Sequence, residues 1–102
     1  MNENVGWYVY ILECKTRELY VGISKDVNER LKKHNEGRAC RYTKFRRPVR
    51  LLYQESCENY QTARKRERQV KRYSRTKKLE LINDIETSHP ADAGFEVQKF
   101  TS

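Results

Sequence analysis

The side chain with the clearest chemical potential is Glu67, the one carboxylate in a strongly basic stretch. From Tyr60 to Lys78 the chain has nine Lys or Arg residues and no other acid. Helical spacing would place Glu67 on an inward stripe with Tyr60, Ala63, Val70 and Ser74. Burying a carboxylate there is costly unless it is paired or bound to a metal. Two interpretations follow. Glu67 forms a structural ion pair with a nearby arginine, or it binds a divalent cation such as Mg²⁺, which needs few protein ligands besides water and substrate phosphates.

The N-terminal segment is expected to bring phenol groups onto one surface. Residues 7–13 and 19–23 are rich in β-branched and aromatic side chains, which predicts two strands of a β-hairpin. Tyrosines on such a face more often pack in a core than take part in chemistry, and Gly22 inside a strand predicts close approach of another group. With a turn near Thr16, one face of the hairpin would hold Tyr8, Tyr10, Leu12, Tyr20 and Gly22.

The next segment predicts a helix that presents Arg30 and His34. It would begin after a polar cap at Ser24 or Asp26 and run to about Glu36. Because Arg30 and His34 are four residues apart, both would project from the same face of this helix. Taken alone, such a pair is more often a surface feature than a functional one.

The rest of the chain predicts a small α/β fold. After a basic loop over residues 38–48, the patterns indicate one strand and then two helices, at residues 49–55, 59–73 and 76–86. We expect a three-stranded, mainly antiparallel sheet flanked by helices in the order ββαβαα, forming one domain over residues 1–86. The small and polar residues 87–102 predict a flexible C-terminal tail.

Composition narrows the class of partner. The chain has 102 residues, a formal net charge of +8 and a pI near 9.6, which favours polyanions such as nucleic acid or an anionic membrane surface. No apolar run approaches the roughly 20 residues of a membrane-spanning helix, and no secretory signal opens the chain. We therefore expect a cytoplasmic protein that does not bind membranes. Three widely spaced cysteines predict reduced thiols: Cys14, Cys40 and Cys57.

Taken together and in this order, these residues resemble the GIY-YIG nuclease superfamily. The resemblance spans about residues 7–83. It is strongest to the compact bacterial stand-alone branch, which is similar to the nuclease domain of the excision-repair incision protein. It rests on the paired signature for which the family is named and on three later positions, here Tyr8-Val-Tyr10, Tyr20-Val-Gly22, Arg30, His34 and Glu67.

The resemblance implies an endonuclease that hydrolyses phosphodiester bonds in DNA, including structured or damaged DNA of the kind met in DNA repair. Glu67 would bind one Mg²⁺ or Mn²⁺ ion beside the scissile phosphate, and Arg30 would neutralise charge growing on the phosphoryl oxygens. The attacking water needs a base. The candidates are Tyr20 or Tyr10, with a pKa lowered by the metal and nearby cations, and His34.

Several further residues are expected to meet the substrate, and two other functions stay open. Gly22 would leave space for the substrate backbone. A non-catalytic nucleic-acid binding module is favoured by the net charge and by Leu79, which stands near where some family members carry Asn. A basic domain for an acidic protein partner is the other alternative. RNA as a substrate also stays open, and we expect a monomer. Nucleic-acid contacts are expected from Arg38, Tyr42, Lys44, Arg64, Lys71 and Lys78.

Overall fold

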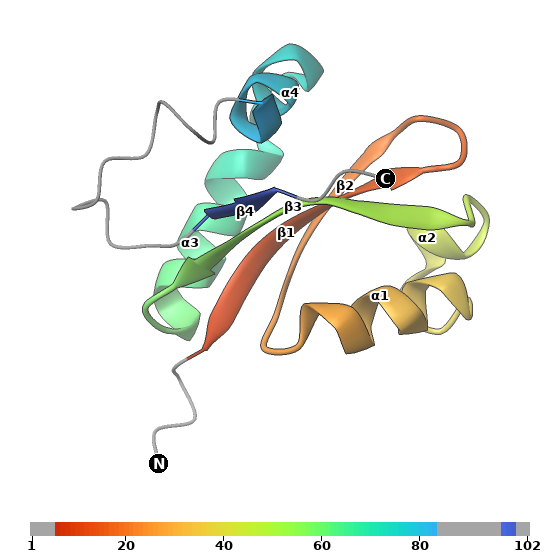
Figure 1. The fold of residues 1–102 in the computed structure, drawn as a ribbon, viewed down its shortest axis with the longest axis horizontal. Helices are drawn as coiled ribbons and strands as arrows, with labels where there is room; N and C mark the ends of the chain where they lie inside the picture. Colours follow the sequence, from red (N-terminus) through yellow and green to blue (C-terminus); the bar gives the residue numbers. More distant parts are fainter. Residues whose placement is uncertain (1–5, 84–96, 100–102) are drawn as a thin grey trace.

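The computed structural model describes residues 6–83 and 97–99, and its elements follow the predicted order (Figure 1). The order ββαβαα is confirmed, with a short helix inside the basic loop and a short C-terminal strand added to it. The elements are β1 (Trp7–Cys14), β2 (Leu19–Ser24), α1 (Val27–Asn35), α2 (Arg41–Lys44), β3 (Val49–Cys57), α3 (Tyr60–Lys71), α4 (Arg75–Asn83) and β4 (Val97–Lys99).

The sheet has the strand order β2-β1-β3-β4, and every neighbouring pair is antiparallel. The hairpin register places Tyr10 opposite Gly22 and Leu12 opposite Tyr20, so the predicted shared face is confirmed. Strand β4 adds to the three predicted strands by pairing with β3, which covers an edge that would otherwise present unpaired backbone groups.

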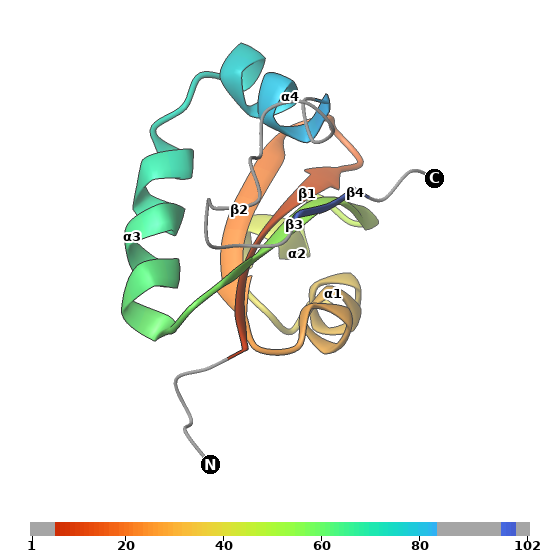
Figure 2. The ribbon, with the colours of Figure 1, turned by 60° about the vertical axis from the view of Figure 1, so that its left-hand side comes forward.

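Helices cover both faces of the sheet, with α3 on one side and α1 on the other (Figure 2). Because side chains alternate along a strand, the central strand β1 supplies both layers, and none of its residues is exposed. Its Val9 and Ile11 pack toward Ala63 and Val70 of α3. The opposite layer is a second core cluster formed by Tyr10, Leu12, Cys14, Val27 and Val49.

Helices α1 and α3 begin at side-chain caps. The Asp26 carboxylate accepts a 3.0 Å hydrogen bond from the Glu29 amide at the start of α1, and Asn59 caps α3 in the same way. Of the predicted inward positions on α3, Ala63 and Val70 are fully buried. The prediction for Ser74 is wrong, since it is exposed: α3 ends at Lys71, and the Ser74 hydroxyl instead accepts a hydrogen bond from the Lys77 amide in the first turn of α4.

The predicted tail over residues 87–102 lies outside the described residues except at Val97–Lys99, which form β4. None of the helices in the described part of the chain has the length and apolar character needed to cross a bilayer.

Candidate active site

Tyr10 and Gly22 face each other across the β1–β2 pair, and Tyr10 is almost completely buried. A Cβ atom built on Gly22 would lie 2.5 Å from the Tyr10 hydroxyl oxygen. The predicted close approach at Gly22 is therefore confirmed. The ring of Tyr10 is the group that approaches, and the role of Gly22 toward a substrate backbone stays a prediction.

His34 lies buried in the last turn of α1, and both of its ring nitrogens have partners. Nε2 is 3.0 Å from the Tyr10 hydroxyl, and Nδ1 is 2.7 Å from Oγ1 of Thr43. Burial, reinforced by the positive charge of Arg30, lowers the pKa of His34 to about 4. The imidazole is therefore neutral at neutral pH, when it has one donor and one acceptor nitrogen.

Tyr20 completes an aromatic group on the same face. Its ring centroid lies 5.1 Å from that of His34 and 5.9 Å from that of Tyr42, with which it is stacked. Burial raises the pKa of Tyr20, and a hydrogen bond with the Cys40 thiol raises it further.

The tyrosine pKa values differ from the sequence expectation. Burial is the largest influence on Tyr10 as well, and it raises the pKa of both phenols. Arg30 lowers both values, as expected of a nearby cation, but its effect is smaller than that of burial. The protein's own cations therefore do not lower the tyrosine pKa values below the usual range, because desolvation disfavours the phenolate more strongly than Arg30 favours it.

Glu67 belongs to the same electrostatic group although it lies on α3. Its negative charge raises the pKa values of Tyr10 and Tyr20. Helix α3 packs on β1 and β2, and β2 is the edge strand, so a side chain on α3 can approach both tyrosines around that edge. The structure thus brings Tyr10, Tyr20, Arg30, His34 and Glu67 together.

The immediate partners of Glu67 are basic and half exposed. The Glu67 side chain retains 13% of its surface and lies 3.3 Å from Lys71 Nζ and 3.6 Å from Arg64 Nε. Arg64 is therefore an arginine partner of the kind that the ion-pair interpretation expected for Glu67. The contact lacks the short, parallel hydrogen bonds of a strong arginine–carboxylate pair. Both cations flank a carboxylate that still reaches solvent.

Two residues of this group were missed by sequence reasoning. Thr43 is fully buried on α2, and Cys40 precedes that helix with its sulfur 3.4 Å from Thr43 Oγ1. The basic loop gave no periodic signal for a four-residue helix, and sequence spacing did not link Thr43 to His34. The three cysteines are free thiols, as predicted.

The expected nucleic-acid contacts divide into three locations. Near α2, Arg38 is exposed beside Glu36, Lys44 lies 5.7 Å from the Phe45 ring centroid, and Arg46 stacks on Tyr42 at 4.0 Å. Arg64 and Lys71 flank Glu67, whereas Lys78 lies apart from them on α4. A shallow depression beside α2 is lined by Gly37, Arg38, Ala39, Cys40, Arg41, Lys44 and Phe45.

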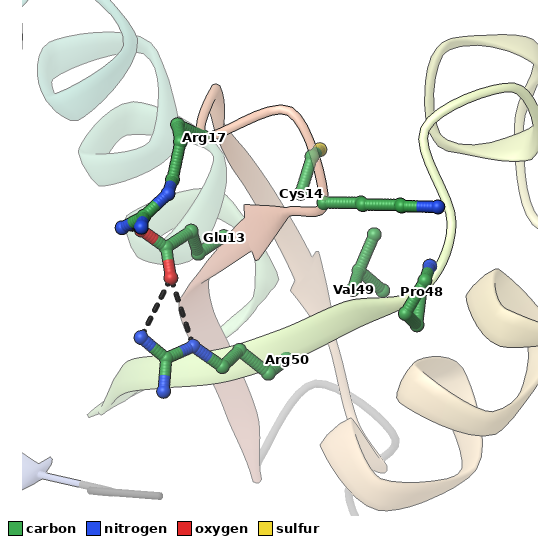
Figure 3. Close-up of a pocket in the computed structure, with 7 residues that line it drawn as sticks. Glu13, Cys14, Arg17, Pro48, Val49 and Arg50 are labelled. Atoms are coloured by element: carbon green, nitrogen blue, oxygen red, sulfur yellow. Dashed lines mark hydrogen bonds and ion pairs between the residues drawn. The ribbon is translucent and has the colours of Figure 1, made fainter.

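Another pocket lies at the ends of β1 and β3 and contains none of the candidate site residues. There Arg50 directs its guanidinium at one carboxylate oxygen of Glu13, with Nε at 2.8 Å and Nη2 at 2.7 Å (Figure 3). Arg17 approaches the other oxygen at 3.8 Å. The carboxylate is thus already occupied by cations, and this pocket has the character of a surface ion-pair network.

Comparison with known proteins gives a consistent picture. The family model for the GIY-YIG catalytic domain matches residues 6–80. UPF0213 proteins of Staphylococcus aureus and Staphylococcus saprophyticus are 52% and 49% identical over 77 residues, covering 76% of this chain and 94% of each relative. The solution NMR structure of a UPF0213 protein from Bacillus halodurans is 42% identical, with a TM-score of 0.50 over 76% of this chain and 82% of that one.

Proposed function

Because this chain belongs to the GIY-YIG catalytic domain family, we propose that it is a metal-dependent endonuclease that hydrolyses phosphodiester bonds in DNA. The observation that carries the proposal is the grouping of two phenols, an imidazole, a guanidinium and a carboxylate at one edge of the sheet. Phosphodiester hydrolysis requires charge neutralisation, a route for a proton and a place for a cation, and these side chains supply all three.

The donors at Glu67 fit a hard divalent cation. Mg²⁺ or Mn²⁺ can be held by one carboxylate, with water and phosphate oxygens as its other ligands. Within residues 6–83 and 97–99 no three His, Cys, Asp or Glu side chains gather into a fuller ligand set, which favours such an ion over zinc at a thiolate or imidazole site. When bound at Glu67, the cation would polarise the scissile phosphate.

Arg30 and the basic neighbours of Glu67 act on the phosphate itself. Arg30 is close enough to lower the pKa values of both phenols and of His34, so its charge is available to an anion at the same place. A guanidinium can donate two parallel hydrogen bonds to phosphoryl oxygens. Lys71 and Arg64 would turn from Glu67 toward the flanking phosphates, since both side chains are about half exposed.

The proton of the attacking water passes to the hydrogen-bonded phenol and imidazole. Both phenols are protonated at neutral pH because burial raises their pKa values. Tyr10 can accept a proton from water only as it gives up its own, and His34 Nε2 lies 3.0 Å from its hydroxyl. His34 is neutral, so its free lone pair can receive that proton.

The proposal is tested by a metal-dependent cleavage assay on labelled plain and branched DNA. Glu67→Gln keeps the size of the side chain and removes its charge, and we expect it to cut at least a hundredfold more slowly in Mg²⁺ or Mn²⁺. Glu80→Gln is the matched control, because Glu80 is an exposed glutamate on α4 and its loss leaves the rate unchanged. Cleavage that persists in a chelator, or equal rates for both variants, would reject the proposal.

A second function, a non-catalytic nucleic-acid binding module, is favoured by Leu79. This residue stands near where some family members carry Asn, and here it packs against the core beneath α3 and α4. Such a module would bind DNA or RNA with an affinity that falls steeply as salt rises, by about one unit of logarithmic slope per phosphate contacted. Its binding would be indifferent to Glu67→Gln, and no cleavage would accompany it.

A further inference from the structure

Thr43 has no direct route to a substrate, yet it holds the imidazole at the centre of the site. Its side chain is fully buried, and its Oγ1 lies 2.7 Å from Nδ1 of His34. Helix α2 places it there, nine residues after His34 and on the opposite side of the ring from Tyr10. A buried hydroxyl at this distance makes one of the shortest side-chain hydrogen bonds in the site.

The remaining partners of Thr43 decide which way its hydroxyl points. Oγ1 is 3.4 Å from the Cys40 sulfur and 3.5 Å from the Cys40 carbonyl oxygen. Thr43 is the donor to the carbonyl oxygen, whereas either atom can donate in the contact with the sulfur. Hydrogen bonds with Thr43 help to lower the pKa of the Cys40 thiol against the opposing effect of its burial. A hydroxyl has a single proton. If Thr43 donates it to Cys40, its oxygen can only accept from His34.

We propose that Thr43 is a positioning residue that holds His34 in the Nδ1–H tautomer, leaving Nε2 as an acceptor for the Tyr10 hydroxyl. The proton order is then Tyr10 O–H to Nε2, Nδ1–H to Thr43, and Thr43 O–H to Cys40. A neutral imidazole with the proton on Nε2 would present a donor to Tyr10 and have no lone pair there. The catalytic consequence of this arrangement rests on the proposed nuclease function; the tautomer itself does not.

The tautomer is read directly by NMR of ¹⁵N-labelled imidazoles in the full chain, without substrate or metal. We expect wild-type His34 to carry its proton on Nδ1. Thr43→Val keeps the shape of the side chain and removes the hydroxyl, so the Nδ1–H form should give way to Nε2–H. Thr43→Ser restores the hydroxyl and should restore the wild-type pattern. Thr62→Val, an exposed threonine on α3, is the control and should leave the His34 signals unchanged.

Cleavage assays add a second readout. Thr43→Val should lower the turnover rate about fivefold, the factor that corresponds to one net hydrogen bond, and Thr43→Ser should recover most of it. Proton on Nε2 in the wild type, or an Nδ1–H signal that survives in Thr43→Val, overturns the inference. If no variant cuts DNA but the tautomer moves as expected, the positioning role stands and the nuclease proposal fails.

Discussion

The carboxylates of Glu55 and Glu67 both form ion pairs with side chains of α3, and their surroundings are opposite. Glu55, on β3, is 1% exposed and accepts hydrogen bonds from Arg66 Nε at 2.8 Å and Nη2 at 3.2 Å, with a third at 2.5 Å from the Tyr53 hydroxyl. Glu67, on α3, meets Arg64 and Lys71 at 3.6 and 3.3 Å, and both of those partners are about half exposed.

The contrast shows how one fold can hold a fixed, fully paired carboxylate and a second carboxylate that is free to exchange its partners. Glu55 has its charge matched by a bidentate arginine inside the protein, so no acceptor capacity faces a ligand. Glu67 lies beside two half-exposed cations and has part of its surface in solvent, and its charge acts on two phenols. A carboxylate with loosely held, exposed partners can exchange them for a cation and phosphate, whereas the Glu55 cluster cannot rearrange without leaving a buried charge.

The largest loss of stability is expected when the Glu55 carboxylate loses its arginine partner. Arg66→Met removes the guanidinium and leaves the Glu55 carboxylate buried without its cation, so the free energy of unfolding should fall by about 3–5 kcal/mol. Urea denaturation at pH 7 measures it. Arg68→Met, an exposed position on the same helix, should change stability by less than about 0.5 kcal/mol. A loss as small as that of the control would show that the two carboxylates are equivalent after all.

The second expected effect is a pH dependence that originates at His34. Its pKa is about 4 in the folded protein and about 6.5 in the unfolded chain. The unfolded state therefore binds more protons between these values, so stability is complete above pH 6.5 and falls by up to about 3 kcal/mol as the pH drops toward 4. Urea midpoints from pH 7.5 to 4 should show a steeper loss in the wild type than in His34→Gln. Parallel curves would contradict the neutral, buried imidazole.

A third, smaller effect concerns the close contact at Gly22. The Cβ of Gly22→Ala would lie 2.5 Å from the hydroxyl oxygen of the buried Tyr10, so the ring must move, at a cost of about 1–3 kcal/mol. The shift should also weaken the Tyr10–His34 hydrogen bond and slow cleavage. The ring carbon Cζ of Tyr10 lies only 2.6 Å from this Cβ, so the hydroxyl and the ring must both be removed to relieve the contact. Adding Tyr10→Leu does so, and the double variant should lose less stability than the sum of the single variants. Strict additivity would show that the two residues do not compete for this space.

The smallest expected effect is the stability change in Glu67→Gln. Ion pairs with half-exposed partners contribute about 0–1 kcal/mol, so the unfolding midpoint should stay close to that of the wild type even though cleavage is lost. Calorimetry would measure the unfolding midpoint, and the cleavage assay on the same preparation would measure the rate. A loss near that of Arg66→Met would instead assign Glu67 a structural role and sharpen the case for a non-catalytic module.

Local patterns predicted the hairpin face well. The two-residue period of the strands and the short turn sufficed to place Tyr10, Tyr20 and Gly22 on one face, as their register confirms. A polar cap with helical spacing sufficed to place Arg30 and His34 on α1. The helical stripe of α3 was right at Ala63 and Val70 and failed at Ser74, where the start of the next helix competes for the residue.

Features that depend on docking were out of reach. Thr43 meets His34 only because α2 folds back against α1, and a four-residue helix has no amphipathic period to reveal it. The Glu55–Arg66 pair forms between β3 and α3, and β4 exists by pairing with β3. The raised pKa values of the phenols follow from burial, which composition and spacing describe poorly.

The position of Glu67 on a helix late in the chain has a consequence for the order of assembly. Tyr10, Tyr20, His34 and Thr43 all come from residues 10–43 and can meet by closing short loops, which costs comparatively little chain entropy. Glu67 joins them only when α3 docks on β1 and β2, a contact between segments distant in sequence. A partly folded chain could thus assemble the proton-transfer side of the site before the carboxylate arrives, and cleavage would begin only at that last docking event.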